Sequence, residues 1–285
     1  MKIAVLSGKG GTGKTLVSVN LAAAAGKAVY TDCDVEEPNG HLFFKPAITE
    51  EKEINVPVPR VDKNLCNGCR KCVDFCNFNA LAYVKDGLLI FDDICHSCGG
   101  CVSICPEKAL HEEDRNIGVL KIGTSEETII ATGIMNTGES SGIPIIKGLL
   151  SLDHPKDFIE FIDCPPGSSC AVMESIREAD YCLMVVEPTL FGTHNFMMVH
   201  ELAALFQKPH SVIMNKYSVH YMPVEEYCKN NNIPVLVRIP YDPLLGILNS
   251  NGLIAVRENA AYRDFFVDLL DRVLKEVRHE AASHS

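Results

Sequence analysis

One short stretch near the N-terminus decides the fold of this chain: Gly8-Lys9-Gly10-Gly11-Thr12-Gly13-Lys14-Thr15. It fits the pattern G-x-x-x-x-G-K-[ST], in which glycines let the backbone approach a polyphosphate and backbone N–H groups point inward. We expect an apolar strand before it, at 3–6, and an alanine-rich helix after it, at 16–25. The loop would then end at a positively polarised helix N-terminus, which attracts anions. An ordinary glycine-rich turn is the alternative interpretation.

The two residues that end this loop carry most of its expected chemistry. Lys14 would place a point charge on the terminal phosphates, and the Thr15 hydroxyl would bind Mg²⁺. The sequence therefore predicts a site for Mg²⁺ and a nucleoside triphosphate. The remaining phosphate contacts are expected from the rest of the loop: Gly8, Lys9, Gly10, Gly11, Thr12 and Gly13.

The segments after the loop continue a strand–helix rhythm. A strand at 28–31 completes a β–α–β start, which favours a parallel sheet. Further strands are predicted at 128–134, 158–162, 181–186, 211–214 and 234–238, and helices at 142–151, 171–178, 194–206, 223–231 and 260–278. The predicted fold is α/β, with a mostly parallel sheet and helices on both faces.

A cysteine-rich segment, residues 61–113, interrupts this rhythm early. It predicts a small inserted α+β domain within a discontinuous nucleotide domain made of residues 1–60 and 114–285. The insert repeats internally, since 79–81 matches 108–110, which predicts two related half-modules. A linker is predicted before it, at 38–60, because this segment contains four prolines, at 38, 46, 57 and 59.

Eight of the 13 cysteines fall into two copies of the spacing Cys-x2-Cys-x2-Cys-x3-Cys. Soft thiolates suit iron–sulfur clusters, and this run resembles that of bacterial two-cluster ferredoxins, where the fourth cysteine of each run ligates the other cluster. The first predicted 4Fe–4S cluster is held by Cys66, Cys69, Cys72 and Cys105. The second is held by Cys95, Cys98, Cys101 and Cys76.

Zinc and disulfides are the alternatives for these cysteines. Zinc sites typically pair two separate Cys-x2-Cys hooks, and disulfide frameworks belong to small secreted domains. The ferredoxin pattern has a proline after each cysteine run. Pro106 follows the second run, but Asn77 replaces the proline after the first, which affects the rigidity of the backbone there and not the ligands.

The other five cysteines are not expected to bind these clusters. Cys33, Cys164, Cys182 and Cys228 are interpreted as small structural residues. Cys170 lies near an expected dimer face, so a subunit-bridging ligand is its alternative role. Because no Cys-x2-Cys pair follows residue 113, the bridging site of Mrp-type carriers is not expected.

With its second lysine, Lys9, the phosphate loop resembles the deviant Walker A motif of the MinD/ParA family, which also includes the nitrogenase iron protein and Mrp-type cluster carriers. The resemblance covers roughly residues 1–270. It implies that Lys9 reaches the phosphates held by a partner subunit. ATP binding would then close a homodimer, or a heterodimer with a paralogue.

Two acidic strings extend the resemblance. Asp32-Cys33-Asp34 is similar to the first switch, which implies that Asp34 orients the attacking water and Asp32 lies in the outer shell of Mg²⁺. The string 161–167 is similar to Walker B and the second switch, which implies that Asp163 holds Mg²⁺ through water and the Gly167 N–H senses the γ-phosphate. A helix N-cap is the alternative for Asp34, and a simple strand-terminal carboxylate is the alternative for Asp163.

Two later strings imply contacts with the nucleotide base. The resemblance places Asn215, at the end of a strand, on one side of the base and Pro240, in Ile239-Pro240-Tyr241, on the other. Plain loops are the alternative for both.

Composition limits the other partners. The formal charge of −11 argues against a nucleic-acid-binding face, which needs a basic stripe. No apolar run reaches the roughly 18 residues of a spanning helix, and the start of the chain lacks signal-peptide features. We therefore expect a reduced, cytoplasmic protein with no membrane and no nucleic-acid partner. The apolar stripe of the last helix is expected to pack on the core.

These observations lead to one main hypothesis of function: a dimeric ATPase that couples Mg·ATP to electron transfer, through two clusters, to a redox protein partner. A cluster carrier or assembly ATPase of the Mrp type is the main alternative. A positioning protein acting on membranes or DNA is a third. The amide-forming synthetases of cobalamin synthesis are also similar, but no glutaminase domain is evident here.

Overall fold

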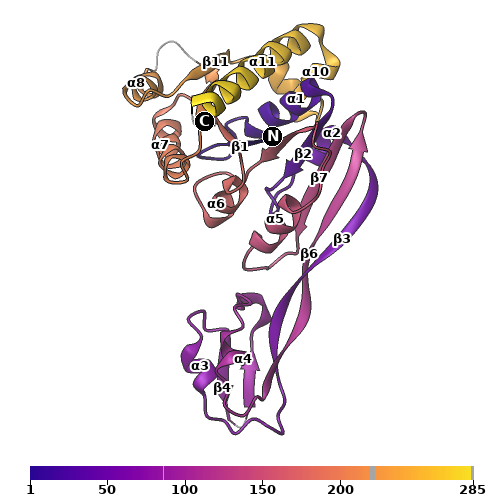
Figure 1. Cartoon of the computed structure of the whole chain (residues 1–285), viewed down its shortest axis with the longest axis vertical. Coiled ribbons are helices and arrows are strands. Elements are labelled where there is room, and N and C mark those ends of the chain that lie inside the picture. Colours follow the sequence, from indigo (N-terminus) through magenta and orange to yellow (C-terminus); the bar gives the residue numbers. More distant parts are fainter. Residues whose placement is uncertain (86, 218–221, 284–285) are drawn as a thin grey trace.

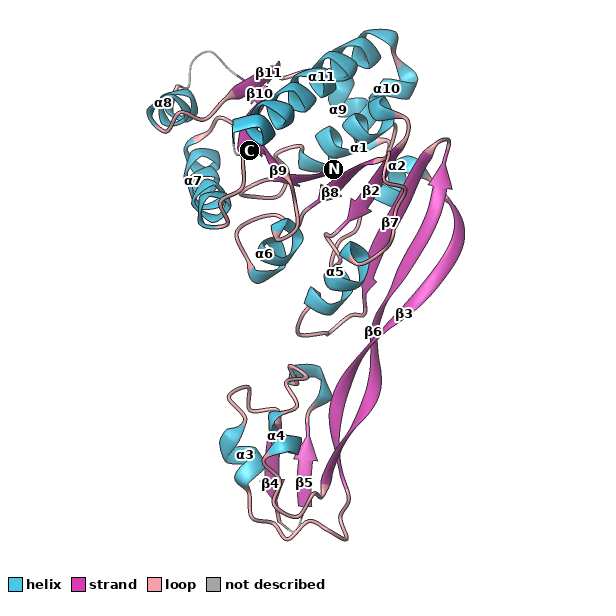
Figure 2. Ribbon diagram, in the orientation of Figure 1, coloured by secondary structure: helices cyan, strands magenta, loops and turns pink. Residues whose placement is uncertain are grey.

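The computed structural model describes residues 1–85, 87–217 and 222–283. Figure 1 shows a large α/β body that contains both ends of the described chain and a small lobe beside one end of it. A long two-stranded ribbon, β3 and β6, connects the two parts (Figure 2). The nucleotide loop therefore belongs to the body, whereas the cysteine runs belong to the lobe.

The described part of the body is built on a nine-stranded sheet in the order β11-β10-β9-β1-β8-β2-β7-β6-β3. Neighbouring strands from β11 to β7 are parallel, and β6 and β3 add an antiparallel edge. The predicted α/β fold with a mostly parallel sheet is confirmed. The strands are β1 Lys2–Leu6, β2 Ala28–Asp32, β3 Ala47–Val61, β6 Leu110–Ser125, β7 Thr128–Met135, β8 Ile159–Asp163, β9 Tyr181–Val186, β10 His210–Tyr217 and β11 Val235–Pro240.

Helices cover both faces of this sheet, because successive residues of each buried strand point to opposite sides. On β1, Ile3 and Val5 join one buried cluster, with α1, α10 and α11, while Ala4 and Leu6 join the other, with α5, α6, α7 and α8. No described helix is both long and apolar enough to cross a membrane. The helices of the body are α1 Lys14–Ala25, α2 Gly40–Phe44, α5 Ile143–Leu150, α6 Cys170–Ile176, α7 Leu190–Leu205, α8 Pro223–Asn230, α9 Pro243–Ser250, α10 Ala255–Glu258 and α11 Ala260–Ser283.

The linker predicted at 38–60 is wrong. This segment contains α2 and most of β3, a 15-residue strand that pairs with the 16-residue β6. Its prolines misled the prediction, because proline cannot donate to a ladder and argues against a central strand. Pro57 and Pro59 are tolerated because β3 is the last strand of the sheet, and its outer edge requires no N–H donor.

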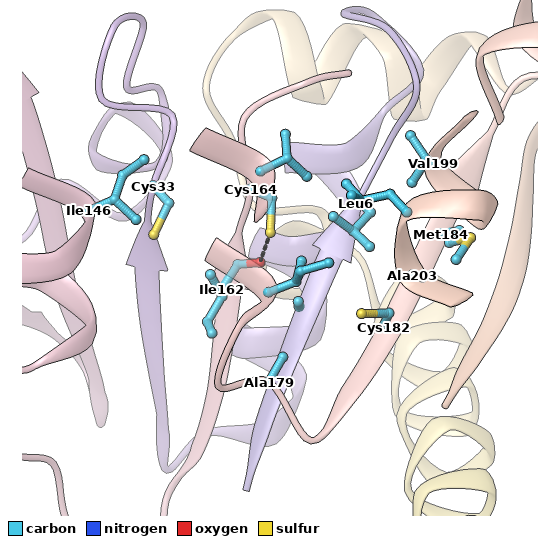
Figure 3. Close-up of a cluster of buried hydrophobic side chains, with 14 of the residues drawn as sticks. Leu6, Cys33, Ile146, Ile162, Cys164, Ala179, Cys182, Met184, Val199 and Ala203 are labelled. Atoms are coloured by element: carbon cyan, nitrogen blue, oxygen red, sulfur yellow. Dashed lines mark hydrogen bonds between the residues drawn. The ribbon is translucent and has the colours of Figure 1, made fainter. Parts of the chain in front are cut away.

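Four of the five remaining cysteines are small core residues, as expected. Cys33, Cys164, Cys182 and Cys228 are all almost completely buried. Figure 3 shows three of them among aliphatic side chains such as Leu6 and Ile162, with the Cys164 thiol directed at the Ile162 carbonyl, 3.7 Å away. Cys170, in contrast, is exposed at the start of α6.

The lobe lies between the far ends of β3 and β6. Its elements are α3 Lys71–Phe75, β4 Leu81–Val84, β5 Gly87–Ile90, the 3₁₀ turn η1 Asp92–Ile94 and α4 Gly100–Ser103. Its buried apolar cluster is small: Ala80, Leu81, Leu88, Cys101 and Leu110. Such a core provides little hydrophobic stabilisation, and domains of this size usually depend on metals or disulfides.

The internal repeat predicted for this segment is visible in the lobe's backbone. Residues with positive φ recur 29 positions apart, which is the offset between the two cysteine runs. Gly68, Arg70 and Asn79 have φ of 73°, 62° and 55°, and the matching residues of the second half have 51°, 68° and 50°. The second set is Ser97, Gly99 and Lys108.

Candidate nucleotide site and paired cysteine cages

A cavity of about 570 Å³ opens at the carboxyl ends of the parallel strands, where open α/β sheets bind ligands. The phosphate loop, 9–15, forms one wall. Asp34 contributes from the segment after β2 and Asn215 from β10, and the end of α9 contributes Asn249 and Ser250. The structure thus brings most of the predicted nucleotide contacts into one hollow.

The loop conformation explains why glycine is needed at position 13. Gly13 has φ of 94° and immediately precedes α1, which begins at Lys14. A Cβ there would lie 2.1 Å from Asn215 Nδ2, too close for any other residue. The Asn215 Nδ2 donates instead to the Thr12 carbonyl at 2.7 Å, which ties the end of β10 to the phosphate loop.

Lys14 is buried in an ion pair with Asp163. The two atoms, Nζ and Oδ1, lie 2.6 Å apart, and the Tyr30 hydroxyl donates to Asp163 Oδ2 at 2.7 Å. Burial would lower the pKa of Lys14, but the charge and hydrogen bond of Asp163 outweigh it and raise that pKa. Lys14 is therefore a fixed cation, and a phosphate must draw it away from Asp163.

The two aspartates after β2 occupy different environments. Asp32 is buried and accepts the Asn39 and Gly40 N–H groups at 3.1 and 2.9 Å. Burial, together with the charge of Asp163, raises the pKa of Asp32 to about 7. Asp34 lines the cavity, where burial raises its pKa to about 6. The N-cap alternative for Asp34 is wrong, because the next helix, α2, begins only at Gly40.

Lys9 is held by its own chain. Its Nζ lies 3.1 Å from Glu187 Oε2 and 5.7 Å from the centroid of the Phe191 ring. Glu187 also lies 3.7 Å from the Nζ of Lys216, which donates to the Gly11 carbonyl. The ring of Phe191 and the neighbouring Leu190 are largely exposed, at 64% and 79%. Lys9 therefore lies beside an exposed apolar face at the start of α7.

Of the predicted second-switch glycine and the two predicted base-contact residues, only Asn215 lines the cavity. Gly167 has φ of 91°, and its N–H donates to the Ser7 carbonyl at 2.8 Å, so a γ-phosphate would have to compete for it. Asn215 lines the cavity, but Pro240, at the exposed end of β11, is not among the lining residues.

The lining residues from α9 were missed by the sequence reasoning. A signal for this helix was present: Asp242 followed by proline at the first helical position is a typical N-terminus. The Asp242 carboxylate accepts the Leu244 and Leu245 N–H groups, at 2.9 and 3.2 Å.

The lobe contains two cavities, each lined by four cysteines, which we call the first and second cages. The first has a volume of about 20 Å³ and is lined by Cys66, Cys69, Cys72 and Cys105. The second has a volume of about 210 Å³ and is lined by Cys76, Cys95, Cys98 and Cys101. Each cage thus takes three cysteines from one run and the fourth from the other.

The cysteine thiols and nearby N–H groups of the cages are suitable for binding an iron–sulfur cluster, although the first cage is nearly closed. Backbone N–H groups of Ala80 and Ala109 point at the Cys76 and Cys105 sulfurs, at 3.4 and 3.3 Å, positions again 29 residues apart. Within the described residues, no three His, Cys, Asp or Glu side chains converge closely enough to hold a single ion. The thiols surround a space instead, and those of the first cage would have to open outward to admit a cluster.

An open parallel sheet with a glycine-rich loop and a buried lysine at its carboxyl edge defines a P-loop nucleotide-binding protein. Residues 3–255 match the model of the CobQ/CobB/MinD/ParA nucleotide binding domain family, and the chain belongs to that family. It is 30% identical to the uncharacterised protein MJ0578 of Methanocaldococcus jannaschii, over 97% of both chains. It is 26% identical to MJ0579 of the same organism, over 85% of this chain and 86% of the other.

Solved structures support the same fold. MinD of Pyrococcus horikoshii, complexed with Mg-ADP, is similar with a TM-score of 0.59 and 20% identity, covering 95% of both chains. The ATP complex of a McdA variant from Cyanothece is similar with a TM-score of 0.58 and 12% identity, covering 98% of this chain and 96% of that one.

Proposed function

We propose that this protein is a dimeric Mg·ATP-dependent ATPase that couples the nucleotide to electron transfer through two 4Fe–4S clusters held in its lobe. One observation carries the proposal: a P-loop cavity and two four-cysteine cages occur in one chain, joined by a continuous β-ribbon. The similarity to the structures of MinD with Mg-ADP and of a McdA variant with ATP supports the nucleotide half.

In the nucleotide half, the residues around the cavity bind the phosphates, Mg²⁺ and the attacking water. The loop N–H groups and Lys14 bind the phosphates, and the Thr15 hydroxyl contributes to Mg²⁺. When Lys14 moves to a phosphate, Asp163 loses its ion pair and becomes available to the water shell of Mg²⁺, with Asp32 behind it. Asp34, which lines the cavity, is the carboxylate placed to orient the attacking water.

Dimer closure is supported by the environment of Lys9. Its ammonium lies at the rim of the cavity next to the exposed Leu190 and Phe191, a face that a second subunit would cover. A partner that presented phosphates could replace Glu187 as the counter-charge of Lys9. Two relatives of this chain occur in one organism, so the partner is either the same chain or a similar second chain.

In the lobe, the donor set supports iron–sulfur clusters. Each cage offers four thiols and a nearby N–H donor to sulfur, and hydrogen bonds of this kind tune cluster potential. Such a cluster, when bound, takes up and releases one electron. Each cage has one exposed cysteine, Cys69 in the first and Cys98 in the second, but Cys95 of the second cage packs against the body. The first cage is therefore the side that we assign to a redox partner.

A cluster carrier remains the second candidate, and one observation favours it: Cys69 and Cys98, one from each cage, are exposed. Exposed ligands allow an acceptor's thiols to compete for iron. Against it, each cage provides all four ligands within one chain, so a bound cluster has no open position.

The test uses protein purified anaerobically, with iron, sulfide and hydrolysis measured together. We expect about eight iron and eight sulfide per chain from two such clusters. In Lys14→Ala and the milder Lys14→Gln, hydrolysis should fall at least about 100-fold, while Lys275→Ala, an exposed lysine on α11, leaves it unchanged. The reduction rate of an acceptor should differ between Mg·ATP and Mg·ADP. Zinc without sulfide, hydrolysis retained without Lys14, or transfer of the iron to an apo-protein would each contradict the proposal.

A further inference from the structure

The lobe meets the body through polar contacts around the point where the ribbon leaves the sheet. β6 pairs with β7 only as far as Gly118, and beyond it β3 and β6 continue as a two-stranded ribbon. The register shifts there, since Ile54 pairs with Gly118 but Asn55 pairs with Asn116. A bulge at such a place bends and twists the strand, so Ile117 marks the hinge of the ribbon.

One arginine just beyond this hinge contacts both parts. Arg115 forms a bidentate ion pair with Glu139, with N–O distances of 2.7 and 2.6 Å. Its second nitrogen also donates to the Asp92 carbonyl at 3.2 Å. Glu139 lies in the loop after β7 in the body, and its side chain is only 8% exposed. Bidentate pairs of this kind fix orientation as well as distance.

On the lobe side, the contact leads directly to the second cage. Asp92 accepts two hydrogen bonds from Arg60 of β3, at 2.7 and 2.8 Å. Its carbonyl also accepts the N–H of Cys95 at 3.1 Å. Cys95 and its neighbour His96 line a 250 Å³ cavity whose other wall contains Glu139 and Lys147 of the body. The cavity lining also includes the apolar Val56 and Ile143, and Cys95 packs against the apolar cluster of the body, so the ion pairs orient the lobe alongside apolar contacts.

On the body side, the same loop leads to the nucleotide cavity. Val35, next to Asp34, is buried, and its carbonyl accepts the Met135 N–H at 2.9 Å. A Cβ on Gly142 would lie 2.4 Å from Val35, so the two residues are in close contact. Met135 and Gly142 are the two ends of the loop that contains Glu139. Val35 therefore connects Asp34 to both ends of that loop.

From these contacts we infer that Arg115 and Glu139 form a latch that couples the nucleotide cavity to the orientation of the cysteine lobe. The inference rests on the proposed function, since it requires that the cavity bind a nucleotide. The latch is one contiguous set of contacts, Asp34–Val35, the loop 136–141, Arg115, Asp92 and Cys95. Nucleotide binding shifts the equilibrium between the closed and the open latch, and this shift changes the orientation of the second cage.

The test is hydrogen exchange on the full chain, with and without a non-hydrolysable Mg·ATP analogue. In the wild type, the analogue should change exchange at 92–98 and 110–117 at least about threefold. In Glu139→Gln and Arg115→Lys, that change should disappear while protection of the phosphate loop, 8–15, by the analogue is kept. Without the analogue, both variants should exchange about tenfold faster at 92–98, because a charged hydrogen-bonded pair is lost.

The control is Glu51→Gln, which removes the carboxylate of another ion pair between β3 and β6, Glu51 with Lys121 at 3.3 Å, in the part of these strands that belongs to the sheet. It should behave as the wild type. If the latch variants keep the nucleotide response at 92–98, or the wild type lacks it while 8–15 is protected, the latch is refuted and the nucleotide site stands. If the wild type shows no protection at 8–15, the proposed function itself fails.

Discussion

The nucleotide cavity and the cysteine cages are organised in opposite ways. The cavity is lined by Lys14 of α1, Asp34 after β2 and Asn215 of β10, which lie far apart in the sequence. Lys14 pairs with Asp163 at the end of β8, and Asn215 donates to the Thr12 carbonyl, so hydrogen bonds at the edge of the sheet hold the site. The cages take all their donors from 40 consecutive residues, 66–105, over a buried cluster of five residues. A site supported by a sheet exists before its ligand arrives, whereas we expect a site in so small a lobe to depend on the proposed clusters for its stability.

The largest expected effect tests that dependence. Removing iron with a chelator should raise exchange across the lobe, 62–109, at least about 100-fold, because metal binding and folding are one process in such small domains. The strands β1, β8 and β9 should keep their protection. Hydrogen exchange with mass spectrometry measures both regions in one sample.

A matched variant makes this test specific. Cys170→Ser removes an exposed thiol outside the cages and should retain iron and lobe protection, whereas Cys101→Ser, in the second cage, should lose part of both. A lobe that stays fully protected after its iron has gone would show that the two regions do not differ in this way.

The same contrast explains what the sequence could predict. The phosphate loop, the strand and helix periods and the cysteine spacing are local signals, and they predicted the body, the Lys14 loop and the two cysteine runs. The exchange of the fourth cysteine between the runs was predicted from the resemblance to two-cluster ferredoxins, not from the spacing. The course of β3 was missed because prolines at 57 and 59 argue against a strand, and only the sheet order shows that their N–H edge faces no neighbour. The latch between Arg115 and Glu139 also could not be predicted, because nothing in the sequence pairs these two residues and only the fold brings them together.

A preformed nucleotide site keeps carboxyl groups buried even without its ligand, so the stability of the body should depend on pH. The folded-state pKa of Asp32 is raised to about 7 from 3.8, mainly by burial. Stability from this group is therefore fully present below about pH 4 and is lost as the pH rises through 7. Asp32→Asn, without nucleotide, should gain stability over the wild type from pH 5 to pH 8, on the order of 2–4 kcal/mol at most. Denaturant unfolding at both pH values measures it.

A carboxylate with the opposite shift is the control. A hydrogen bond from Tyr262 lowers the pKa of Asp242, so its stabilisation is already complete at pH 5. The difference between Asp242→Asn and the wild type should therefore be the same at pH 5 and pH 8. If the gain in unfolding free energy of Asp32→Asn is also independent of pH, burial does not destabilise the ionised form of Asp32.

The smallest expected effect concerns a partly exposed cation of the preformed site. Lys9 is paired with Glu187, and the two side chains are 23% and 21% exposed, so this is a partly solvated ion pair worth about 1 kcal/mol or less. Glu187→Gln should release Lys9 toward a partner's phosphates and strengthen Mg·ATP-dependent dimerisation by up to about fivefold. Sedimentation with and without nucleotide measures this change, and Glu225→Gln, which breaks the pair with Arg238, should not cause it. Weaker dimerisation of Glu187→Gln would mean that Glu187 supports the dimer face rather than restraining Lys9.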